Sequence, residues 1–397
     1  MAHQYKYIIV GGGLAGASAV EGIRSRDESG SIALFAKESR LPYDRPPLSK
    51  GLWSGKTTFD QLSVYPESFY SSRNVHVVLG CEVTEVDTRK NQIVDNAGHR
   101  YTYDKLLIAT GGSPRRLSFG EGAIHYFRTA DDYLELREET TLHDSFAVIG
   151  GGFIGGELTA ALVSAGKKVT MLFPDKFILQ KVLPADLARF VTEYYRSKGV
   201  TIMDGDVPTD AARAGGVITL KTREGKKVTA DVALAAIGLN LHLEIAKRAG
   251  IKVENGIVVN ALLQTSSPNV YAAGDVAFFP AKSLDKSIRI EHWNNAQSQG
   301  KHAGENMAGA GRPFDYLPFF YSDLFDLGFE AVGDLDSRLV TYADWHEEYR
   351  EGVVYYLDSG CVKGVLLWNV WDKVDDARKL IERKKHYQHL EHLKGML

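Results

Sequence analysis

The sequence predicts an α/β protein with more than one domain. Short buried strands alternate with helical stretches, which is typical of this class. A strand followed by Gly-x-Gly-x-x-Gly and a helix occurs twice, about 140 residues apart, and this unit is typical of Rossmann-type domains. From about residue 316, aromatic strand-like segments such as 352–357 precede a helix predicted over 375–383. We therefore expect two Rossmann-type domains and a C-terminal α+β domain.

Length and composition agree with a globular protein of several domains. A chain of 397 residues is too long for one compact core. Its hydrophobic content of 44% and charged content of 24% are ordinary. A net charge of −3 argues against a surface that binds nucleic acid. No apolar run approaches the roughly 18 residues that a membrane span requires.

The cysteines and the N-terminus favour a cytoplasmic location. Cys81 and Cys361 lie far apart, without a Cys-x-x-Cys pair or a zinc-ligand spacing, so inert thiols are favoured over a disulfide or a nucleophile. No metal site is expected. The first residues lead directly into a strand over 7–10, with no signal or transit peptide.

Two glycine loops predict two dinucleotide sites. The first lies between the strand over 7–10 and a helix predicted over 17–23, and the second between a strand over 146–149 and a helix predicted over 157–164. Glycines let the backbone approach a pyrophosphate, which the N–H groups and dipole of the helix N-terminus then bind. One such loop is weak evidence, because glycines also form tight turns, but two in this context are strong. The candidate residues are Gly11, Gly13, Leu14, Ala15 and Gly16 in the first loop, and Gly150, Gly152, Phe153, Ile154 and Gly155 in the second.

An acidic residue about 20 positions after each loop usually binds the adenosine ribose. After the first loop the candidates are Glu38 and the neighbouring Lys37. After the second, Phe173 stands where the acid is expected and Asp175 follows two residues later. A carboxylate at this place repels a 2′-phosphate, so Asp175 favours NADH over NADPH, although Lys176 beside it acts in the opposite sense.

Two further turns indicate a flavin. A buried strand ends in Thr110-Gly111, and a small-residue strand ends in Gly274-Asp275. The glycine allows a close approach to a ligand, and the carboxylate can accept a hydrogen bond from a ribityl hydroxyl. Each turn alone is also compatible with an ordinary strand-to-helix connection.

The proline-rich loop over 41–53 holds two cations in a stiff segment. Three prolines within 42–47 are predicted to exclude a helix there. Arg45 and Lys50 are therefore expected on a rigid loop.

Together these segments resemble the FAD- and NAD(P)H-dependent pyridine-nucleotide oxidoreductases. The pattern Leu-Pro-Tyr-x-Arg-Pro-Pro-Leu-Ser-Lys at 41–50 is similar to that of the oxygenase-coupled ferredoxin reductases and apoptosis-inducing factor, and segments such as 321–324, 328–333, 364–369 and 377–381 resemble the latter. The resemblance implies an FAD domain over 1–118 and 245–315, an NAD(H) domain over 119–244 and a C-terminal interface domain over 316–397. Disulfide reductases of this group have a redox cysteine just after the ribose acid, but no cysteine precedes Cys81 here. Lys37 and Tyr321 also depart from the family pattern, which has an acid and a tryptophan there.

The resemblance also implies roles for individual residues. Arg45 would contact the FAD pyrophosphate or ribose, and Lys50 would reach the flavin and pair with Glu157. Taken singly, Lys50 is better explained as an exposed loop lysine, and Glu157 as a carboxylate that favours a helix N-terminus. Their placement in two loops that would face each other across the flavin favours the functional pair. Phe153 would cover the flavin face and move for the nicotinamide, or else be a core aromatic.

His292 and Trp293 precede a helix predicted over 294–307 and would flank the flavin, or else cap the helix and fill the core. The dipole of that helix would favour the anionic reduced flavin. The resemblance alone further implies Val83 and Arg128 as FAD contacts, and Gly238, Tyr321 and Glu330 as NAD contacts.

The expected function is that of an FAD-dependent NADH:acceptor oxidoreductase. Its acceptor would be ferredoxin, rubredoxin, a quinone or dioxygen. The alternative is a flavoprotein whose dimerisation or partner binding changes on reduction by NADH, with slow turnover. The basic residues at 378–379 and 383–385 could serve such contacts, although the tail over 383–392 is expected to be a solvated helix end. The choice between NADH and NADPH, and between monomer and homodimer, is left open.

Overall fold

The computed structural model describes residues 3–397, which divide into two compact units. The first comprises the residues up to Asp44, Asp60–Ser113 and Leu241–Pro318. The second comprises Arg45–Phe59, Pro114–Asn240 and Phe319–Leu397. The strands β7 (Gly112–Pro114) and β16 (Leu239–Leu241) lie where the chain passes between units.

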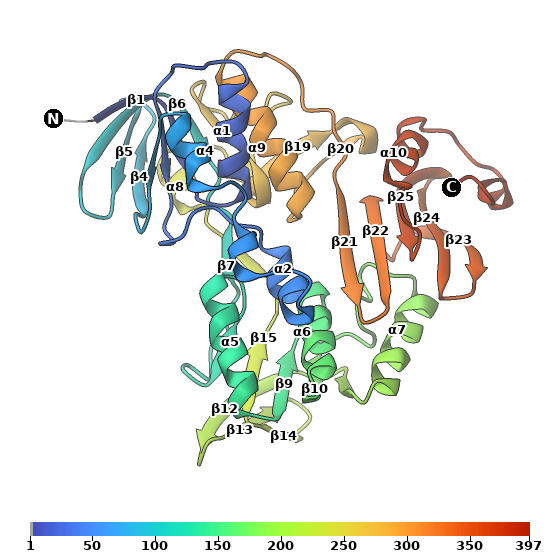
Figure 1. Ribbon diagram of the computed structural model, residues 1–397. Coiled ribbons are helices and arrows are strands. Elements are labelled where there is room, and N and C mark those ends of the chain that lie inside the picture. The colour runs from blue at the N-terminus through green and yellow to red at the C-terminus, as the bar shows by residue number, and fades with distance from the viewer. Residues whose placement is uncertain (1–2) are drawn as a thin grey trace. The chain divides into compact units, whose positions relative to one another are not determined.

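The first unit is built on a largely parallel sheet with the order β3-β2-β1-β6-β5-β4, and β18 pairs with β6 (Figure 1). Residues 7–10 of β1 pair in parallel with β2 and β6, and four buried residues end β1. β18 returns to this sheet from a segment far along the chain, so the unit is split in sequence as predicted. The strands are β1 (His3–Val10), β2 (Ile32–Phe35), β3 (Val75–Val78), β4 (Val83–Asp87), β5 (Gln92–Asp95), β6 (Arg100–Ile108), β17 (Ile257–Val258), β18 (Val270–Ala272), β19 (Ala277–Ala281) and β20 (Lys286–Ile288).

Helices α1 (Leu14–Arg24) and α9 (Trp293–Met307) pack closely against each other in this unit (Figure 1). Glycines on α9 make the approach possible, because a Cβ at Gly300 or Gly304 would lie 2.2 Å from a carbonyl oxygen of α1. The shorter helices are α4 (Glu67–Ser72) and α8 (Glu244–Arg248), and the 3-10 turns are Phe59–Leu62, Gly274–Val276 and Lys282–Leu284.

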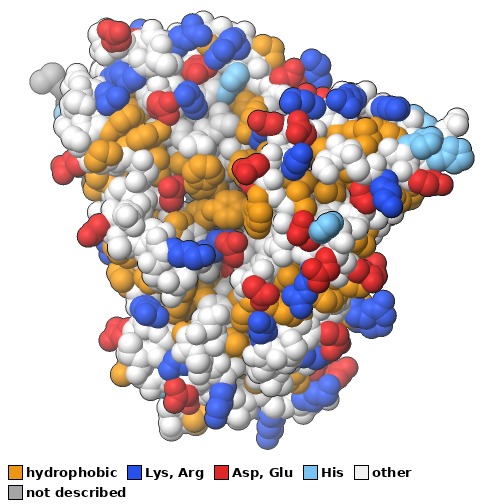
Figure 2. All heavy atoms as spheres, turned by 45° about the vertical axis from the view of Figure 1, so that its right-hand side comes forward, with side chains coloured by type: hydrophobic (Ala, Val, Ile, Leu, Met, Phe, Trp, Pro, Cys, Tyr) orange, Lys and Arg blue, Asp and Glu red, His pale blue; other side chains and the backbone are white. Residues whose placement is uncertain are grey.

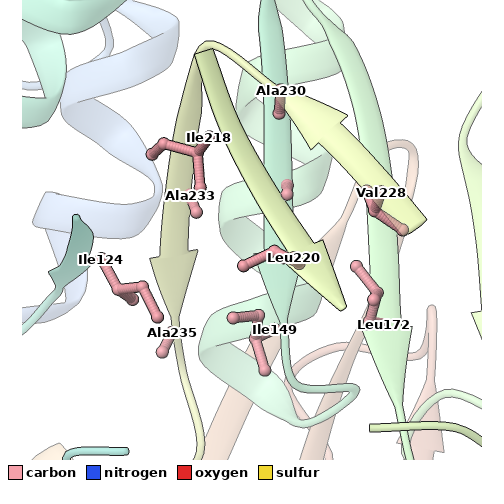
Figure 3. Packing of buried hydrophobic residues seen from close by; sticks show 10 residues of the cluster. Ile124, Ile149, Leu172, Ile218, Leu220, Val228, Ala230, Ala233 and Ala235 are labelled. Atoms are coloured by element: carbon pink, nitrogen blue, oxygen red, sulfur yellow. The ribbon is translucent and has the colours of Figure 1, made fainter. Parts of the chain in front are cut away.

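The second unit contains a parallel sheet with the order β11-β10-β9-β15-β8. An antiparallel sheet, β12-β13-β14, packs on it, and Figure 3 shows the side chains between them. Ile218 and Leu220 of β13 meet Ile149 and Leu172 of the parallel sheet in a cluster that excludes water. The strands are β8 (Ile124–Tyr126), β9 (Ser145–Ile149), β10 (Lys168–Phe173), β11 (Thr201–Asp204), β12 (Pro208–Ala214), β13 (Val217–Thr222), β14 (Lys227–Ala230) and β15 (Val232–Ala235), and the helices are α5 (Ala130–Leu142), α6 (Phe153–Ser164) and α7 (Ala185–Ser197).

The C-terminal segment of the second unit forms an antiparallel sheet with the order β21-β22-β25-β24-β23. Helix α10 (Val374–Glu382) packs on β22 and β25. Six consecutive residues of β24 are buried, which explains the aromatic and branched side chains seen there in the sequence. The strands are β21 (Phe319–Leu324), β22 (Leu327–Gly333), β23 (Val340–Glu347), β24 (Glu351–Asp358) and β25 (Cys361–Trp368).

This architecture confirms the predicted fold class. The further division of the second unit into an NAD domain and a C-terminal domain stays a prediction, because both segments lie in one compact unit.

Three local predictions were wrong. Helices α2 (Pro46–Ser49) and α3 (Gly51–Ser54) occupy the proline-rich loop, because prolines at the first two helical positions need no N–H partner there. Helices α1 and α6 begin three and four residues earlier than predicted, inside the glycine loops. The tail is not a helix end beyond residue 383, because Lys384 has a left-handed φ of 48° that stops α10, and a 3-10 turn follows at Leu390–Leu393.

Two candidate dinucleotide sites

The first glycine loop has the shape of a phosphate cradle. Gly11 has φ 129°, and a Cβ there would lie 2.1 Å from the carbonyl oxygen of Ala109. Gly13 is the N-cap of α1, where no side chain caps the helix and a Cβ would meet only open space. The free N–H groups of α1 and this space fit an anionic group at the helix N-terminus.

Buried polar atoms of α9 add to the fit for FAD. The amide oxygen of Gln299 accepts a hydrogen bond from the N–H of Gly274 at 3.0 Å. The Nε2 of Gln299 and the Oδ1 of Asn295 are buried without a protein partner. Unpaired buried polar atoms are costly, so a polar ligand beside the Gly274 turn would satisfy them. The sequence offered no signal for either amide.

Glu38 and Lys37 have different partners. The hydroxyl of Tyr43 donates to Glu38 Oε2 at 2.5 Å, whereas Lys37 Nζ lies 3.0 Å from Glu82 Oε2 and its side chain is 68% exposed. Glu38 is therefore the carboxylate at the end of β2 that can accept from a ribose, and Lys37 belongs to a surface ion pair.

Trp293 is fixed by a residue of the proline-rich segment. Its indole Nε1 donates to Asp44 Oδ1 at 2.5 Å, and burial raises the pKa of Asp44. His292 is the N-cap of α9, so both residues stand at that helix N-terminus, as predicted. The other expected FAD residues of this unit lie as follows: Val83 is buried at the start of β4, Thr110 Oγ1 donates to the carbonyl of His242 at 2.8 Å, Gly111 has φ 60°, and Asp275 lies in the 3-10 turn that begins at Gly274.

The second glycine loop repeats this geometry in the second unit. Gly150 has φ 124°, and a Cβ there would lie 2.3 Å from the carbonyl oxygen of Ala236. Gly152 is an N-cap without a side-chain cap, and a Cβ there would meet only open space. The residues present therefore fit a second pyrophosphate.

Phe173 has a structural role at the position expected for the ribose acid. It is buried, and a Cβ on Gly151 would lie 2.8 Å from its ring, so the ring supports the loop from below. Asp175 is partly exposed, with Oδ2 3.8 Å from Lys181 Nζ. Asp175 is therefore the candidate ribose acid of the second loop.

The Lys50–Glu157 ion pair is present and buried. Lys50 Nζ lies 2.6 Å from Glu157 Oε1, and the two side chains are 14% and 3% exposed. Lys50 stands between α2 and α3, and Glu157 on the second turn of α6. The Lys50 ammonium also lies 5.2 Å from the ring centroid of Tyr321. A buried charge pair of this kind is typical of a functional site.

Three more expected NAD residues lie near α6 or on the same sheet face. The ring of Phe153 packs edge-on against Phe320, with centroids 5.5 Å apart. Tyr321 and Glu330 are cross-strand partners on β21 and β22, so their side chains share one face. Burial, with a smaller contribution from Asp372, raises the pKa of Glu330, whose Oε2 is buried without a protein partner. That oxygen fits a hydroxyl donor from a ligand.

Arg45, Lys50 and Arg128 were expected at the FAD, and all three lie in the second unit. Arg45 donates to the carbonyl of Arg128 at 2.8 Å. Gly238 has φ 99°, and its carbonyl oxygen accepts a hydrogen bond from the N–H of Arg115 at 2.8 Å. Their cofactor contacts stay predictions.

The basic residues of the C-terminal segment are not a uniform patch. Arg378 is 12% exposed and pairs with Asp375, with 2.5 Å between nitrogen and oxygen. Figure 2 shows Lys and Arg side chains interspersed with Asp and Glu on the face drawn. Burial raises the pKa of the Cys81 thiol to about 11, which agrees with an inert cysteine.

Comparison with known proteins agrees with this geometry. The family described as pyridine nucleotide-disulphide oxidoreductase matches residues 5–300. The chain belongs to this family. A second family, the C-terminal region of mitochondrion-associated apoptosis-inducing factor, matches residues 303–347 and 342–383 of this oxidoreductase.

Relatives cover nearly the whole oxidoreductase. Apoptosis-inducing factor 1 of Dictyostelium discoideum is 33% identical over 98% of this chain and 80% of its own length. Putidaredoxin reductase of Pseudomonas putida is 33% identical over 82% of this chain and 79% of its own. A solved structure of a covalent putidaredoxin reductase–putidaredoxin complex matches with a TM-score of 0.90 at 30% identity, over 96% of this chain and 93% of that one.

This oxidoreductase therefore uses FAD and a nicotinamide dinucleotide, as predicted. Within residues 3–397, none of the helices has both the length and the apolar character of a membrane span.

Proposed function

We propose that this chain is an NADH:acceptor oxidoreductase that reduces an external iron–sulfur protein. The observation that carries the proposal is the buried Lys50–Glu157 pair in the unit that contains the second glycine loop. A structural role alone gives little reason to bury an ammonium at such desolvation cost.

The residues divide into binding and electrostatic roles. The first glycine loop, Glu38 and the polar end of α9 hold FAD, and the second loop with Asp175 and Glu330 holds the nicotinamide dinucleotide. Bound FAD supplies a two-electron acceptor for the nicotinamide hydride. Lys50 supplies a fixed positive charge that stabilises negative charge arising in the reaction, and Glu157 keeps that ammonium protonated and oriented.

The nicotinamide preference follows from Asp175. Its carboxylate is the acidic group at the end of β10 and disfavours a 2′-phosphate there. Lys181 lies 3.8 Å away and reduces this repulsion without removing it. We therefore propose NADH as the preferred donor.

An external acceptor follows from the cysteines. The sequence contains two, Cys81 and Cys361, and the high pKa of Cys81 disfavours the thiolate that disulfide chemistry needs. The putidaredoxin reductase relatives favour a small iron–sulfur protein, of the ferredoxin or rubredoxin class, as acceptor.

The test is anaerobic stopped-flow reduction of the purified FAD-loaded protein by NADH and by NADPH, followed by re-oxidation. We expect faster reduction by NADH, and re-oxidation by a ferredoxin or rubredoxin that is faster than by a quinone or dioxygen. Re-oxidation by none of the protein acceptors would contradict the proposed acceptor class.

A second function is favoured by the match of the C-terminal segment to apoptosis-inducing factor. In this second function, reduction of the flavin by NADH changes dimerisation or partner binding, and turnover is slow. Sedimentation of the oxidised and reduced protein separates the two: fast turnover with an unchanged sedimentation coefficient excludes the second function.

A further inference from the structure

The carboxylate of Glu157 has hydrogen-bond donors besides Lys50. The hydroxyl of Ser49 donates to Oε2 at 2.7 Å, and the hydroxyl of Ser322 donates to Oε1 at 2.6 Å. Both carboxylate oxygens are therefore engaged by a hydroxyl, and Oε1 also by the ammonium.

The donors come from segments far apart in the sequence. Ser49 ends α2 and Ser322 lies on β21, and both are buried. β21 packs on α6, and Leu324 of β21 lies beside Gly156 of α6, where a Cβ would be 3.4 Å from the Leu324 side chain. The C-terminal sheet thus contributes a side chain to the ion pair.

Such donors have a defined effect on a buried carboxylate. Hydrogen bonds to an ionised group are shorter and stronger than those between neutral groups, and they favour the charged form. With one hydroxyl on each oxygen, the carboxylate plane is also fixed, and the position of the ammonium follows from it.

We propose that Ser49 and Ser322 are positioning residues for hydride transfer: they hold the Glu157 carboxylate ionised and in one orientation, and Glu157 in turn holds the Lys50 ammonium. This inference rests on the function proposed above for Lys50. It assigns to the C-terminal sheet a part in the chemistry of the nicotinamide site.

Ionisable side chains near Glu157 come from several elements. Lys50 follows α2. Tyr195 lies on α7, and the pKa of its phenol is raised mainly by burial and to a smaller extent by the Glu157 charge. On β21, Tyr321 contacts the ammonium. β9 has no ionisable side chain, and Lys168 of β10 is exposed at the far end of its strand.

The experiment compares Ser49→Ala and Ser322→Ala with Thr159→Val in the FAD-loaded full chain. Thr159 is a matched control, because it is fully buried on α6 and its hydroxyl has no partner. Ser49→Thr retains the hydroxyl. The first readout is the rate constant for FAD reduction at saturating NADH, together with the dissociation constant for NADH. The second is the melting temperature without nicotinamide, for each variant alone and combined with Glu157→Gln.

We expect each serine-to-alanine change to lower the rate constant for FAD reduction about tenfold, from the size of a charge-assisted hydrogen bond, with the dissociation constant for NADH unchanged. Thr159→Val and Ser49→Thr should keep the parent values. The loss of melting temperature in Ser322→Ala should be larger with Glu157 present than in combination with Glu157→Gln, because the hydroxyl stabilises the carboxylate. The loss in Thr159→Val should be the same in both backgrounds.

Parent rate constants in both alanine variants would overturn the proposal, and so would an equal loss of melting temperature with and without Glu157→Gln, which indicates only a packing role. The variant Lys50→Met tests the function proposed for the ammonium separately from the role of the serines. If that variant reduces FAD at the parent rate, the proposed function of Lys50 fails, and the melting data still decide whether the serines stabilise the Glu157 charge.

Discussion

Replacing Lys50 by methionine tests the ion pair at the second site most directly. At 2.6 Å, two unit charges attract by about 6 kcal/mol at an effective dielectric constant of about 20. Desolvation of both groups offsets much of this attraction, and breaking such a pair typically costs about 3–5 kcal/mol. Because two serine hydroxyls still donate to Glu157, we expect the lower end, about 3 kcal/mol, in the unfolding free energy.

The kinetic effect should be larger than the structural one. Loss of one preorganised charge or donor at a reacting centre typically reduces a rate about 100- to 1000-fold. We expect that reduction in the rate constant for FAD reduction by NADH in Lys50→Met, measured by anaerobic stopped-flow absorbance at saturating NADH. Lys56→Met, at an exposed lysine six residues further on, is the matched control and should retain the parent rate.

A double variant separates stability from chemistry. Lys50→Met with Glu157→Gln removes both charges and should regain most of the lost stability, whereas the reduction rate should stay low. If Lys50→Met alone reduces FAD within threefold of the parent, the buried ammonium has no electrostatic role and the reasoning is refuted.

Three other perturbations follow from single observations. Because the pKa of Glu330 is raised in the folded state, its ionisation destabilises the fold, and stability falls as pH rises above about 4. Glu330→Gln should therefore raise the melting temperature at pH 8 but not at pH 4. An equal gain at both pH values would contradict this. Gly150→Ala places a Cβ 2.3 Å from a carbonyl oxygen at φ 124°, so the protein should remain yellow with FAD yet bind NADH at least tenfold more weakly in a titration. Asp175→Ala should narrow the ratio of NADH to NADPH reduction rates at sub-saturating nucleotide by about tenfold, and an unchanged ratio would exclude Asp175 as the discriminating group.

The glycine loops could be predicted from the sequence because their function depends on the backbone. A positive φ at Gly11 and Gly150, and the close carbonyl beside each, require glycine at fixed positions between a strand and a helix. The strand over 7–10 and the helix that follows are likewise set by local pattern. The helix starts were misplaced by three and four residues, because the last residues of each loop already form the first turn.

Predictions that depended on local chemistry alone were less successful. The prolines within 42–47 predict no helix there, but Pro46 and Pro47 stand at the first positions of α2, where their missing N–H groups are not needed. Phe173 stands where an acid is expected, because Gly151 of the second loop has no side chain and leaves room for the aromatic ring. For the prolines, the position within the helix decides the outcome, and for Phe173 a neighbour in space does. A pattern of residue types along the sequence contains neither.

Ser49 and Ser322 mark the limit of sequence-based inference at this site. A serine at the end of a short helix or within a strand has many compatible roles, and its type alone selects none of them. Its effect on Glu157 arises only because β21 packs on α6 and brings a hydroxyl to 2.6 Å from a carboxylate oxygen. Groups that bind a phosphate through the backbone leave a spacing in the sequence, whereas groups that adjust a buried charge depend on contacts between distant segments. For this fold, the glycine loops are therefore found from the chain itself, whereas the hydroxyls that contact the buried Glu157 carboxylate are found only from its packing.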